Sequence, residues 1–456
     1  CDKAVPAHLK AIARLNAPSI IIPGGVMNAG PDLLTLEQIG KYSAQYQRGE
    51  ITLDEFNYYK HNACPSCGAC SFMGTASTMQ IMTEALGLML PGTALMPATC
   101  KDLKEQAYKA GKQIIKLAKM DLTARDIVTM KSFENAIMVH AAISGSTNSL
   151  LHLPAIASEF GIDLNADLFD QMHQNAHYLL DIRPAGKYPA EYFYYAGGVP
   201  AVMEAIKENL NLDVMTVTGK TLGENLEELK NNGYYENCQT FLDKINLKST
   251  DIIRPYDDPI GKDGTIAILK GNLAPDGAVI KHSACPQEMM QAVLRARPFD
   301  SEEAAIDAII KKQIKPGDAV FIRYEGPKGS GMPEMFYTGE AISSDQELAK
   351  SIALITDGRF SGASKGPVIG HVSPEASEGG PIALIEENDL IKIDVPQRRL
   401  EIIGIEGKQR TSQEITKILK ERHAKWKPKE PKYKNGILSI YTKLATSPMN
   451  GGKMKG

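Results

Sequence analysis

The sequence predicts an α/β protein with two domains: an N-terminal α/β domain with a parallel sheet, incomplete at its start, and a C-terminal β-rich, barrel-like domain. A length of 456 residues is about three times that of a common domain. Helical spacing of apolar residues dominates up to about residue 250, and short β-rich segments dominate after it. We therefore place the domains at residues 1–250 and 251–410, followed by a charged tail at 411–456.

The first domain shows the helix and strand signals of a parallel α/β layer. The isoleucine run in PSIIIPGG, residues 18–25, predicts a buried strand that ends in a Gly-rich loop. Apolar residues recur at helical intervals in four stretches, residues 7–15, 75–90, 101–120 and 132–160. The last stretch is interrupted by SGSTN at 144–148, which predicts a turn with Thr147 or Asn148 near a helix N-cap. This turn is either an anion site or a plain capped loop.

The second domain is predicted from short β-rich segments between Gly, Pro and Asp turns. These segments are TIAILKGNLAPDGAVIKHSA, DAVFIRYEG, IALITDGRF, PVIGHVSPEA and DLIKIDVPQRRLEIIGIEG. Such a series indicates a barrel or sandwich with a few helices. The Lys- and Glu-rich tail, which holds the one tryptophan, Trp426, predicts a surface helix with a frayed end.

Composition excludes several classes of protein. Hydrophobic residues make up 43% and charged residues 23%, as in an ordinary globular protein. The net charge of -3 argues against nucleic acid as a partner. No apolar run is long enough to cross a bilayer, and the start, CDKAVPAHLK, does not resemble a secretory signal, so we predict a cytoplasmic protein. The first residue is Cys and not Met, which predicts a processed, trimmed or partial chain.

Three of the seven cysteines, Cys64, Cys67 and Cys70, fall within CPSCGAC. This spacing is typical of zinc or iron–sulfur sites, because thiols two residues apart can reach one centre. Three thiols do not complete a structural zinc site, so either a distant Cys or His joins them or one position stays open for substrate. Alternatively, Cys64 and Cys67 are buried small hydrophobes and one thiol alone is a ligand.

Other candidate residues lie in Gly-rich loops of the second domain. Glu334 in GPKGSGMPEM is suited to a hard cation such as Mg²⁺, although an exposed Glu is the commoner explanation. Ser361 in TDGRFSGAS follows a predicted strand, but the segment lacks the G-x-S-x-G pattern of a serine hydrolase. Histidines 140, 152 and 371 are expected to be hydrogen-bonded core residues and not ligands.

Eight segments in order resemble one family. They are CDKAVPAHLKAIARLNAPSI, CGACSFMGTASTMQIMTEALGLMLPG, SGSTNSLLHLPAIA, YAGGVPAVM, MTVTGKTLGENL, GNLAPDGAVIK, GPKGSGMPEM and TDGRFSGASKGPVIGHVSPEASEGGPIAL. The chain resembles the dihydroxy-acid and sugar-acid (6-phosphogluconate, aldonic acid) dehydratases over nearly its whole length. The resemblance implies a hydro-lyase that converts a 2,3-dihydroxy acid to a 2-keto acid.

The resemblance also implies cofactors and site residues. It assigns Cys1 and Cys70 to an iron–sulfur cluster, usually [2Fe-2S] with [4Fe-4S] as the alternative, and leaves Cys64 and Cys67 without a required role. Three further residues are implied to hold Mg²⁺: Asp2, Lys3 as a carbamate, and Glu334. Ser361 is implied to be the base, and a homodimer or dimer of dimers is expected.

These roles are chemically reasonable. An iron with an open coordination position can help the C3 hydroxyl leave, and Mg²⁺ can stabilise the charge that develops as the C2 proton is lost. A serine is a poor base unless cations stabilise its alkoxide, so Ser361 is expected beside the metal ligands. We therefore expect a site between the two domains, with the cluster and Mg²⁺ ligands mainly on the first and the base on the second.

The substrate and the completeness of the site are less defined. GTASTM resembles sugar-acid members, whereas GRFSGAS and EGGPIAL resemble the enzyme of branched-chain amino acid biosynthesis, and Ala363 favours a less polar substrate. We expect 2,3-dihydroxy-3-methylbutanoate and its ethyl homologue, with an aldonic acid or a non-catalytic cluster-binding protein as alternatives. The resemblance places a third cluster cysteine and another Mg²⁺ carboxylate upstream of Cys1, so these 456 residues are expected to be a partial chain that holds no stable cluster alone.

Overall fold

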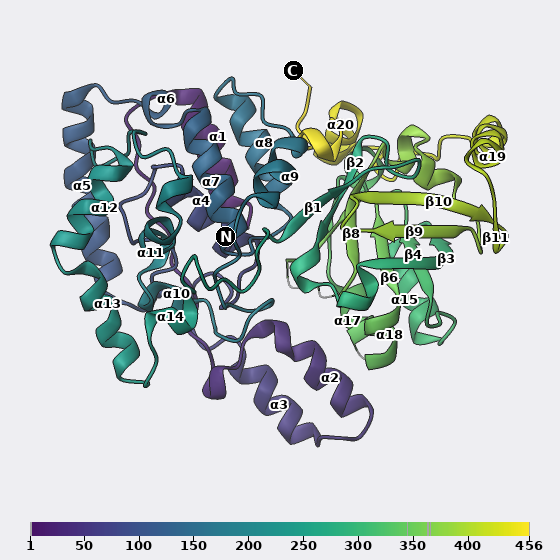
Figure 1. Ribbon diagram of the computed structural model, residues 1–456, viewed down its shortest axis with the longest axis horizontal. Coiled ribbons are helices and arrows are strands. Elements are labelled where there is room, and N and C mark those ends of the chain that lie inside the picture. The colour runs from purple at the N-terminus through teal and green to yellow at the C-terminus, as the bar shows by residue number, and fades with distance from the viewer. Residues whose placement is uncertain (1, 344, 363, 365, 456) are drawn as a thin grey trace. The chain divides into compact units, whose positions relative to one another are not determined.

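The chain divides into two compact units in a computed structural model that describes residues 2–343, 345–362, 364 and 366–455. The first unit consists of Cys1–Tyr42, Gly49–Leu164 and Gln171–Thr265, and the second of Ser43–Arg48, Asn165–Asp170 and Ile266–Gly456. Figure 1 shows the first unit as mostly helical and the second as built around a sheet.

The first unit contains helices α1 (Ala4–Leu15), α3 (Leu53–Asn62), α4 (Thr75–Ala85), α5 (Lys101–Met120), α6 (Ala124–Ile127), α7 (Met130–Ala142), α8 (Ser149–Glu159), α10 (Glu191–Tyr195), α11 (Gly198–Ala205), α12 (Leu222–Asn231), α13 (Tyr234–Asp243) and α14 (Ser249–Ile252). Helices α2 (Ile39–Gln47) and α9 (Ala166–Gln174) are divided between the units. Each of the four predicted helical stretches is confirmed, and SGSTN separates α7 from α8 as expected.

Helix α4 is the central helix of the first unit. Every one of its residues is buried, and it packs against α1, α7, α8 and α11. Most of its residues are apolar or small, and its two longer polar side chains, Gln80 and Glu84, are hydrogen-bonded to backbone groups. It ends at Ala85, earlier than predicted, because Gly87 adopts a left-handed conformation with φ of 84° and turns the chain.

The predicted strand at residues 18–25 is wrong. This segment is extended, but Ile21 donates a backbone hydrogen bond to the carbonyl of Leu88 without forming a ladder. Within the described residues up to Thr265, β structure is limited to isolated bridges, such as the parallel bridges of Val26 to Ala69 and Pro97. The parallel strand pairs of a nine-stranded sheet lie in the second unit.

Glu84, near the end of α4, holds the loop that follows. Its buried carboxylate accepts backbone N–H groups from Gly92 at 2.6 Å and Ala94 at 2.7 Å. Burial raises its pKa from 4.5 to about 7, despite these hydrogen bonds. The proton is therefore bound more tightly in the folded state than in the unfolded state.

We expect Glu84→Gln to reduce the pH dependence of stability. In the parent protein, protonated Glu84 contributes on the order of 3 kcal/mol to the free energy of unfolding. This contribution is fully present below about pH 4.5 and is lost as the pH rises to about 7. Glutamine keeps an acceptor but does not ionise. Denaturant unfolding at pH 5 and pH 8 should show a smaller difference in this variant, whereas exposed Glu55→Gln should leave that difference nearly unchanged. An unaltered difference in Glu84→Gln would contradict the assignment.

The second unit contains strands β1 (Ile266–Leu269), β2 (Gly277–Lys281), β3 (Gln291–Phe299), β4 (Asp318–Ile322), β5 (Glu334–Met335), β6 (Ala353–Thr356), β7 (Arg359–Phe360), β8 (Val368–Ser373), β9 (Leu390–Asp394), β10 (Arg399–Ile405) and β11 (Lys408–Gln409). Its helices are α15 (Glu302–Ile310), α16 (Pro327–Ser330), α17 (Tyr337–Ser343), α18 (Gln346–Ser351), α19 (Ser412–Lys425) and α20 (Gly436–Leu444).

Among the described residues, nine of these strands form one curled sheet in the order β1-β2-β8-β6-β4-β3-β9-β10-β11. The neighbouring strands β8, β6, β4 and β3 are parallel, and the flanking pairs are antiparallel. Lys270, after β1, forms a parallel bridge with Arg399 of β10, and the Asn272 side chain pairs with the Ile402 backbone. These contacts link the two ends of the sheet, so the predicted β-rich, barrel-like domain is confirmed.

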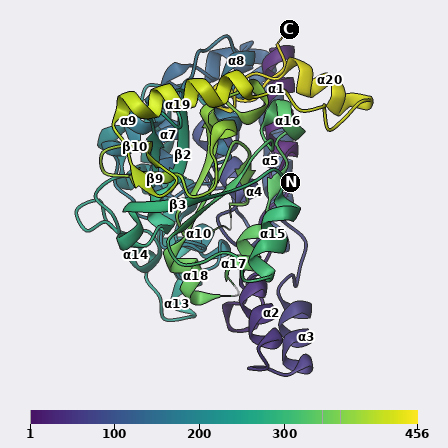
Figure 2. The ribbon, with the colours of Figure 1, turned by 90° about the vertical axis from the view of Figure 1, so that its right-hand side faces the viewer.

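Strand β4 shows why the sheet is covered on both faces. Its side chains alternate between two cores, with Ala319 and Phe321 in one and Val320 and Ile322 in the other. Residues of α15, α17 and α18 complete the second core, and Figure 2 shows these helices grouped together. A strand buried on both faces reads as a continuous apolar run, as this one does.

The C-terminal tail forms two helices and not one. The predicted surface helix is α19, which begins at a Thr411–Glu414 capping box and packs against β10. Helix α20 packs against α16. No helix in the described part of the chain is both long enough and apolar enough to span a membrane.

Candidate active site

Glu334 and Ser361 are brought together by a short ladder in the second unit. Strand β5 pairs in parallel with β7, so that Glu334 lies opposite Arg359 and Met335 lies opposite Phe360. The Ser361 N–H then donates to the Met335 carbonyl at 2.8 Å and continues the ladder by one residue. Two separate segments of the chain thereby place Glu334 and Ser361 in one short ladder, with Ser361 two positions beyond the residue opposite Glu334.

The ladder has one apolar and one polar face. Met335 and Phe360 are 1% and 4% exposed and belong to the core beside α15. Because side chains alternate along extended backbone, Glu334, Arg359 and Ser361 lie on the opposite face. The apolar pair therefore fixes which way the polar groups face.

Arg359 is a residue that the sequence reasoning missed. Its side chain is 6% exposed, and its Nη1 lies 3.4 Å from Glu334 Oε2. Its Nε donates to the Met332 carbonyl at 3.1 Å. It stands two residues before Ser361 in the TDGRFSG segment, and nothing in that segment alone indicates its pairing with Glu334.

The loop that leads to Glu334 is held at its start by Asp357. This buried carboxylate accepts backbone N–H groups from Tyr324 at 3.1 Å, Glu325 at 3.0 Å and Ala376 at 2.8 Å. Burial raises the pKa of Asp357 to about 6. Positions 357, 359 and 361 of one segment thus hold successive parts of the loop and of β5.

Cys70 and Asp2 both belong to the first unit. Burial raises the pKa of the Cys70 thiol, and the nearby Cys64 and Asp2 raise it further. Asp2 forms an ion pair with Lys3. Cys1 lies outside the described residues, as does Ala363.

Cys64 and Cys67 are both exposed, so the alternative that they are buried small hydrophobes is wrong. In the described ranges, no group of three or more His, Cys, Asp or Glu side chains is arranged to hold a metal ion.

The SGSTN loop contacts the start of α4. Thr75 Oγ1 lies 3.1 Å from Ser146 Oγ and accepts from Asn148 Nδ2 at 2.8 Å, and Ser146 N–H donates to Thr78 Oγ1 at 3.0 Å. Asn148 Oδ1 and Ser149 Oγ are buried and have no hydrogen-bond partner among the described residues. The first turn of α4 and the SGSTN loop thus form one polar cluster.

His140 is a core residue, as predicted. It is fully buried; its Nε2 lies 3.0 Å from the Ser146 carbonyl and its Nδ1 lies 3.2 Å from His173 Nε2. The Thr265 N–H donates to His173 Nδ1 at 3.1 Å. Because each ring nitrogen faces a protein group, this chain of hydrogen bonds holds the SGSTN loop in place.

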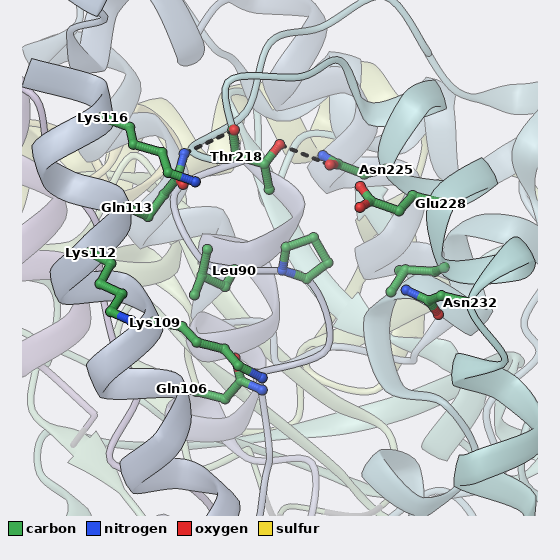
Figure 3. Close-up of a pocket in the computed structure, with 12 residues that line it drawn as sticks. Leu90, Gln106, Lys109, Lys112, Gln113, Lys116, Thr218, Asn225, Glu228 and Asn232 are labelled. Atoms are coloured by element: carbon green, nitrogen blue, oxygen red, sulfur yellow. Dashed lines mark hydrogen bonds between the residues drawn. The ribbon is translucent and has the colours of Figure 1, made fainter. Parts of the chain in front are cut away.

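A groove between α5 and α12 lies apart from these residues (Figure 3). It has a volume of about 360 Å³ and is bordered by Lys109, Lys112 and Lys116. Two of its amides have partners within the protein: Gln113 donates to the Val217 and Thr218 carbonyls, and Asn225 donates to Thr216. None of the predicted site residues lines it.

Comparison with known proteins identifies the family. Residues 1–225 match the dihydroxy-acid/6-phosphogluconate dehydratase N-terminal family model, and residues 251–452 match the corresponding C-terminal model. Dihydroxy-acid dehydratase from Acetivibrio thermocellus is 44% identical over 99% of this chain and 78% of its own length. The enzymes of the same name from Ruminiclostridium cellulolyticum and Methanothrix thermoacetophila are 44% and 43% identical over 100% of this chain and 79% and 78% of their own lengths. The chain therefore belongs to the dihydroxy-acid/6-phosphogluconate dehydratase family.

Proposed function

We propose that this protein is a dihydroxy-acid dehydratase, which removes water from a 2,3-dihydroxy acid to give a 2-keto acid. The observation that carries the proposal is the ladder that sets Glu334 and Ser361 on one polar face. Such an arrangement provides a carboxylate for a hard cation and a hydroxyl for proton transfer at one place. Family membership and the relatives named dihydroxy-acid dehydratase support the same activity.

The proposed cofactors are an iron–sulfur cluster, [2Fe-2S] or [4Fe-4S], and Mg²⁺. Cys70 supplies a thiol, the group that such clusters require, and the Oγ of the adjacent Ser71 is buried with no hydrogen-bond partner among the described residues. We propose that Cys1 and Cys70 hold the cluster, and that Asp2, Lys3 as a carbamate, and Glu334 hold Mg²⁺. When bound, these groups supply Lewis acidity at the C3 hydroxyl and at the substrate oxygens.

The residues of the chain account for the proton transfers. We propose that Ser361 Oγ, as an alkoxide, takes the proton from C2 as the C3–O bond breaks and passes that proton to the departing hydroxide, which leaves as water. The resulting enol loses its O–H proton to solvent and gains a solvent proton at C3 to become the 2-keto acid, so one molecule of water is lost in total and the Ser361 alkoxide is regenerated. Glu334, as a proposed Mg²⁺ ligand, offsets part of the positive charge at the site and so helps to orient the substrate.

The proposed substrates are 2,3-dihydroxy-3-methylbutanoate and its ethyl homologue, which belong to branched-chain amino acid biosynthesis. An aldonic acid is the second candidate, favoured by GTASTM at residues 74–79. We further propose that the protein acts in the cytoplasm as a homodimer or dimer of dimers, a state that size-exclusion chromatography with light scattering would test.

A substrate panel tests this proposal. The cluster-loaded protein with Mg²⁺ should convert the branched-chain acids to keto acids with a kcat/KM at least about tenfold above that for aldonic acids. The keto acid can be measured as its hydrazone. A preference for an aldonic acid would change the substrate assignment, and inactivity toward the whole panel would contradict the dehydratase proposal.

A further inference from the structure

Arg359 is a buried cation whose side chain is only 6% exposed. A buried guanidinium is costly unless a carboxylate and hydrogen-bond acceptors compensate its lost hydration. In the part of the chain that the structure describes, Glu334 is the carboxylate with which it pairs. The placement of Arg359 and that of Glu334 are therefore energetically linked.

The guanidinium contacts two points of the segment that carries Glu334. Its Nε donates to the Met332 carbonyl at 3.1 Å, and its Nη1 faces Glu334 Oε2 at 3.4 Å. Met332 has a left-handed backbone conformation with φ of 56°, which is uncommon for a residue with a side chain. Arg359 thus holds both this turn and the carboxylate that follows it.

The backbone of Arg359 adds a third constraint. Its cross-strand partner in the β5–β7 ladder is Glu334, and Ser361 follows on the same face two residues later. The side chain and the main chain of one residue consequently fix the Glu334 carboxylate relative to Ser361.

We infer that Arg359 is the positioning residue for Glu334: its buried guanidinium pairs with the carboxylate and thereby sets the position in which Glu334 meets a divalent cation. This inference rests on the proposed function, which gives Glu334 its role as a cation ligand. The contact at Nη1 is an ion pair and not a hydrogen bond. Removing an outer group that orients a ligating carboxylate typically changes metal affinity by about 10- to 100-fold.

The direction in which cation affinity changes when Arg359 is removed distinguishes a positioning role from a purely electrostatic one. If Arg359 acted only through its positive charge, its removal would relieve repulsion and tighten the binding of a divalent cation. If it positions Glu334, its removal weakens binding. Lysine in its place keeps the charge but lacks the planar fork that reaches both Met332 and Glu334.

The test is a Mn²⁺ titration of the full-length protein, with free Mn²⁺ measured by electron paramagnetic resonance. Four variants are compared with the parent: Arg359→Gln, Arg359→Lys, Glu334→Gln and, as a matched control, Arg422→Gln. Arg422 is also a part-buried arginine of the second unit, with Nη1 2.5 Å from Asp389 Oδ2. Thermal unfolding of each variant shows whether it is folded.

The inference predicts that both Arg359 variants bind Mn²⁺ at least about 10-fold more weakly, whereas Arg422→Gln binds as the parent does. Unchanged or tighter binding by Arg359→Gln, parent-like binding by Arg359→Lys, or an equal loss in Arg422→Gln would overturn it. Parent-like binding by Glu334→Gln would instead contradict the metal role in the proposed function. The two failures are therefore distinguishable.

Discussion

Ser361→Ala is expected to lower kcat by about 10³-fold or more while Mn²⁺ affinity and cluster absorption stay near those of the parent. The substitution removes the proposed proton acceptor but none of the proposed metal ligands. The Ser361 N–H bond to the Met335 carbonyl is a backbone contact, so alanine can retain the ladder. Steady-state kinetics with the branched-chain acid, together with the Mn²⁺ titration, measure the separation of these effects.

Ser364→Ala is the matched control for this experiment. Ser364 lies in the same loop, and its N–H donates to the Ser361 carbonyl at 3.0 Å. Its hydroxyl has no proposed role in proton transfer, so activity should stay within a few-fold of the parent. Substantial activity in Ser361→Ala with a large loss in Ser364→Ala would move the base to Ser364.

Cys70→Ser is expected to remove the cluster and with it nearly all activity. A serine oxygen is a harder ligand than a cysteine sulfur, and the serine hydroxyl loses its proton less readily than a thiol does. Serine is therefore a poor substitute for cysteine at iron. Iron analysis and visible absorption of the purified variant measure the loss directly, without an activity assay.

Cys64→Ala is the informative control for Cys70→Ser. Cys64 is exposed and lies near Cys70, so it shares the local surroundings but has no proposed role as a ligand. Iron content and absorption should match the parent. A bleached Cys64→Ala variant would show that CPSCGAC supplies more than one thiol to the cluster.

Amphipathic helices were the most predictable part of the fold. Residues 101–120 were predicted as one helix, and α5 has those bounds, because its apolar positions recur at helical spacing over many turns. The strand at residues 18–25 was wrong because a run of three isoleucines does not specify a hydrogen-bonded partner. There the single backbone bond from Ile21 to Leu88 replaces a ladder.

The candidate site was only partly predictable. Motif resemblance selected Glu334 and Ser361, but strands as short as β5 and β7 carry no periodicity from which to predict their pairing. Without that register, Arg359 could not be matched with Glu334. Its importance follows from burial and from a cross-strand contact, which are properties of the folded chain.

The most direct test of the central claim is a proton NMR assay of the cluster-loaded protein with Mg²⁺ and 2,3-dihydroxy-3-methylbutanoate. The account predicts that the C2 proton signal of the substrate disappears as an equimolar amount of the 2-keto acid forms, and that Ser361→Ala forms almost none. Intact substrate after prolonged incubation with the fully loaded parent protein would contradict the account.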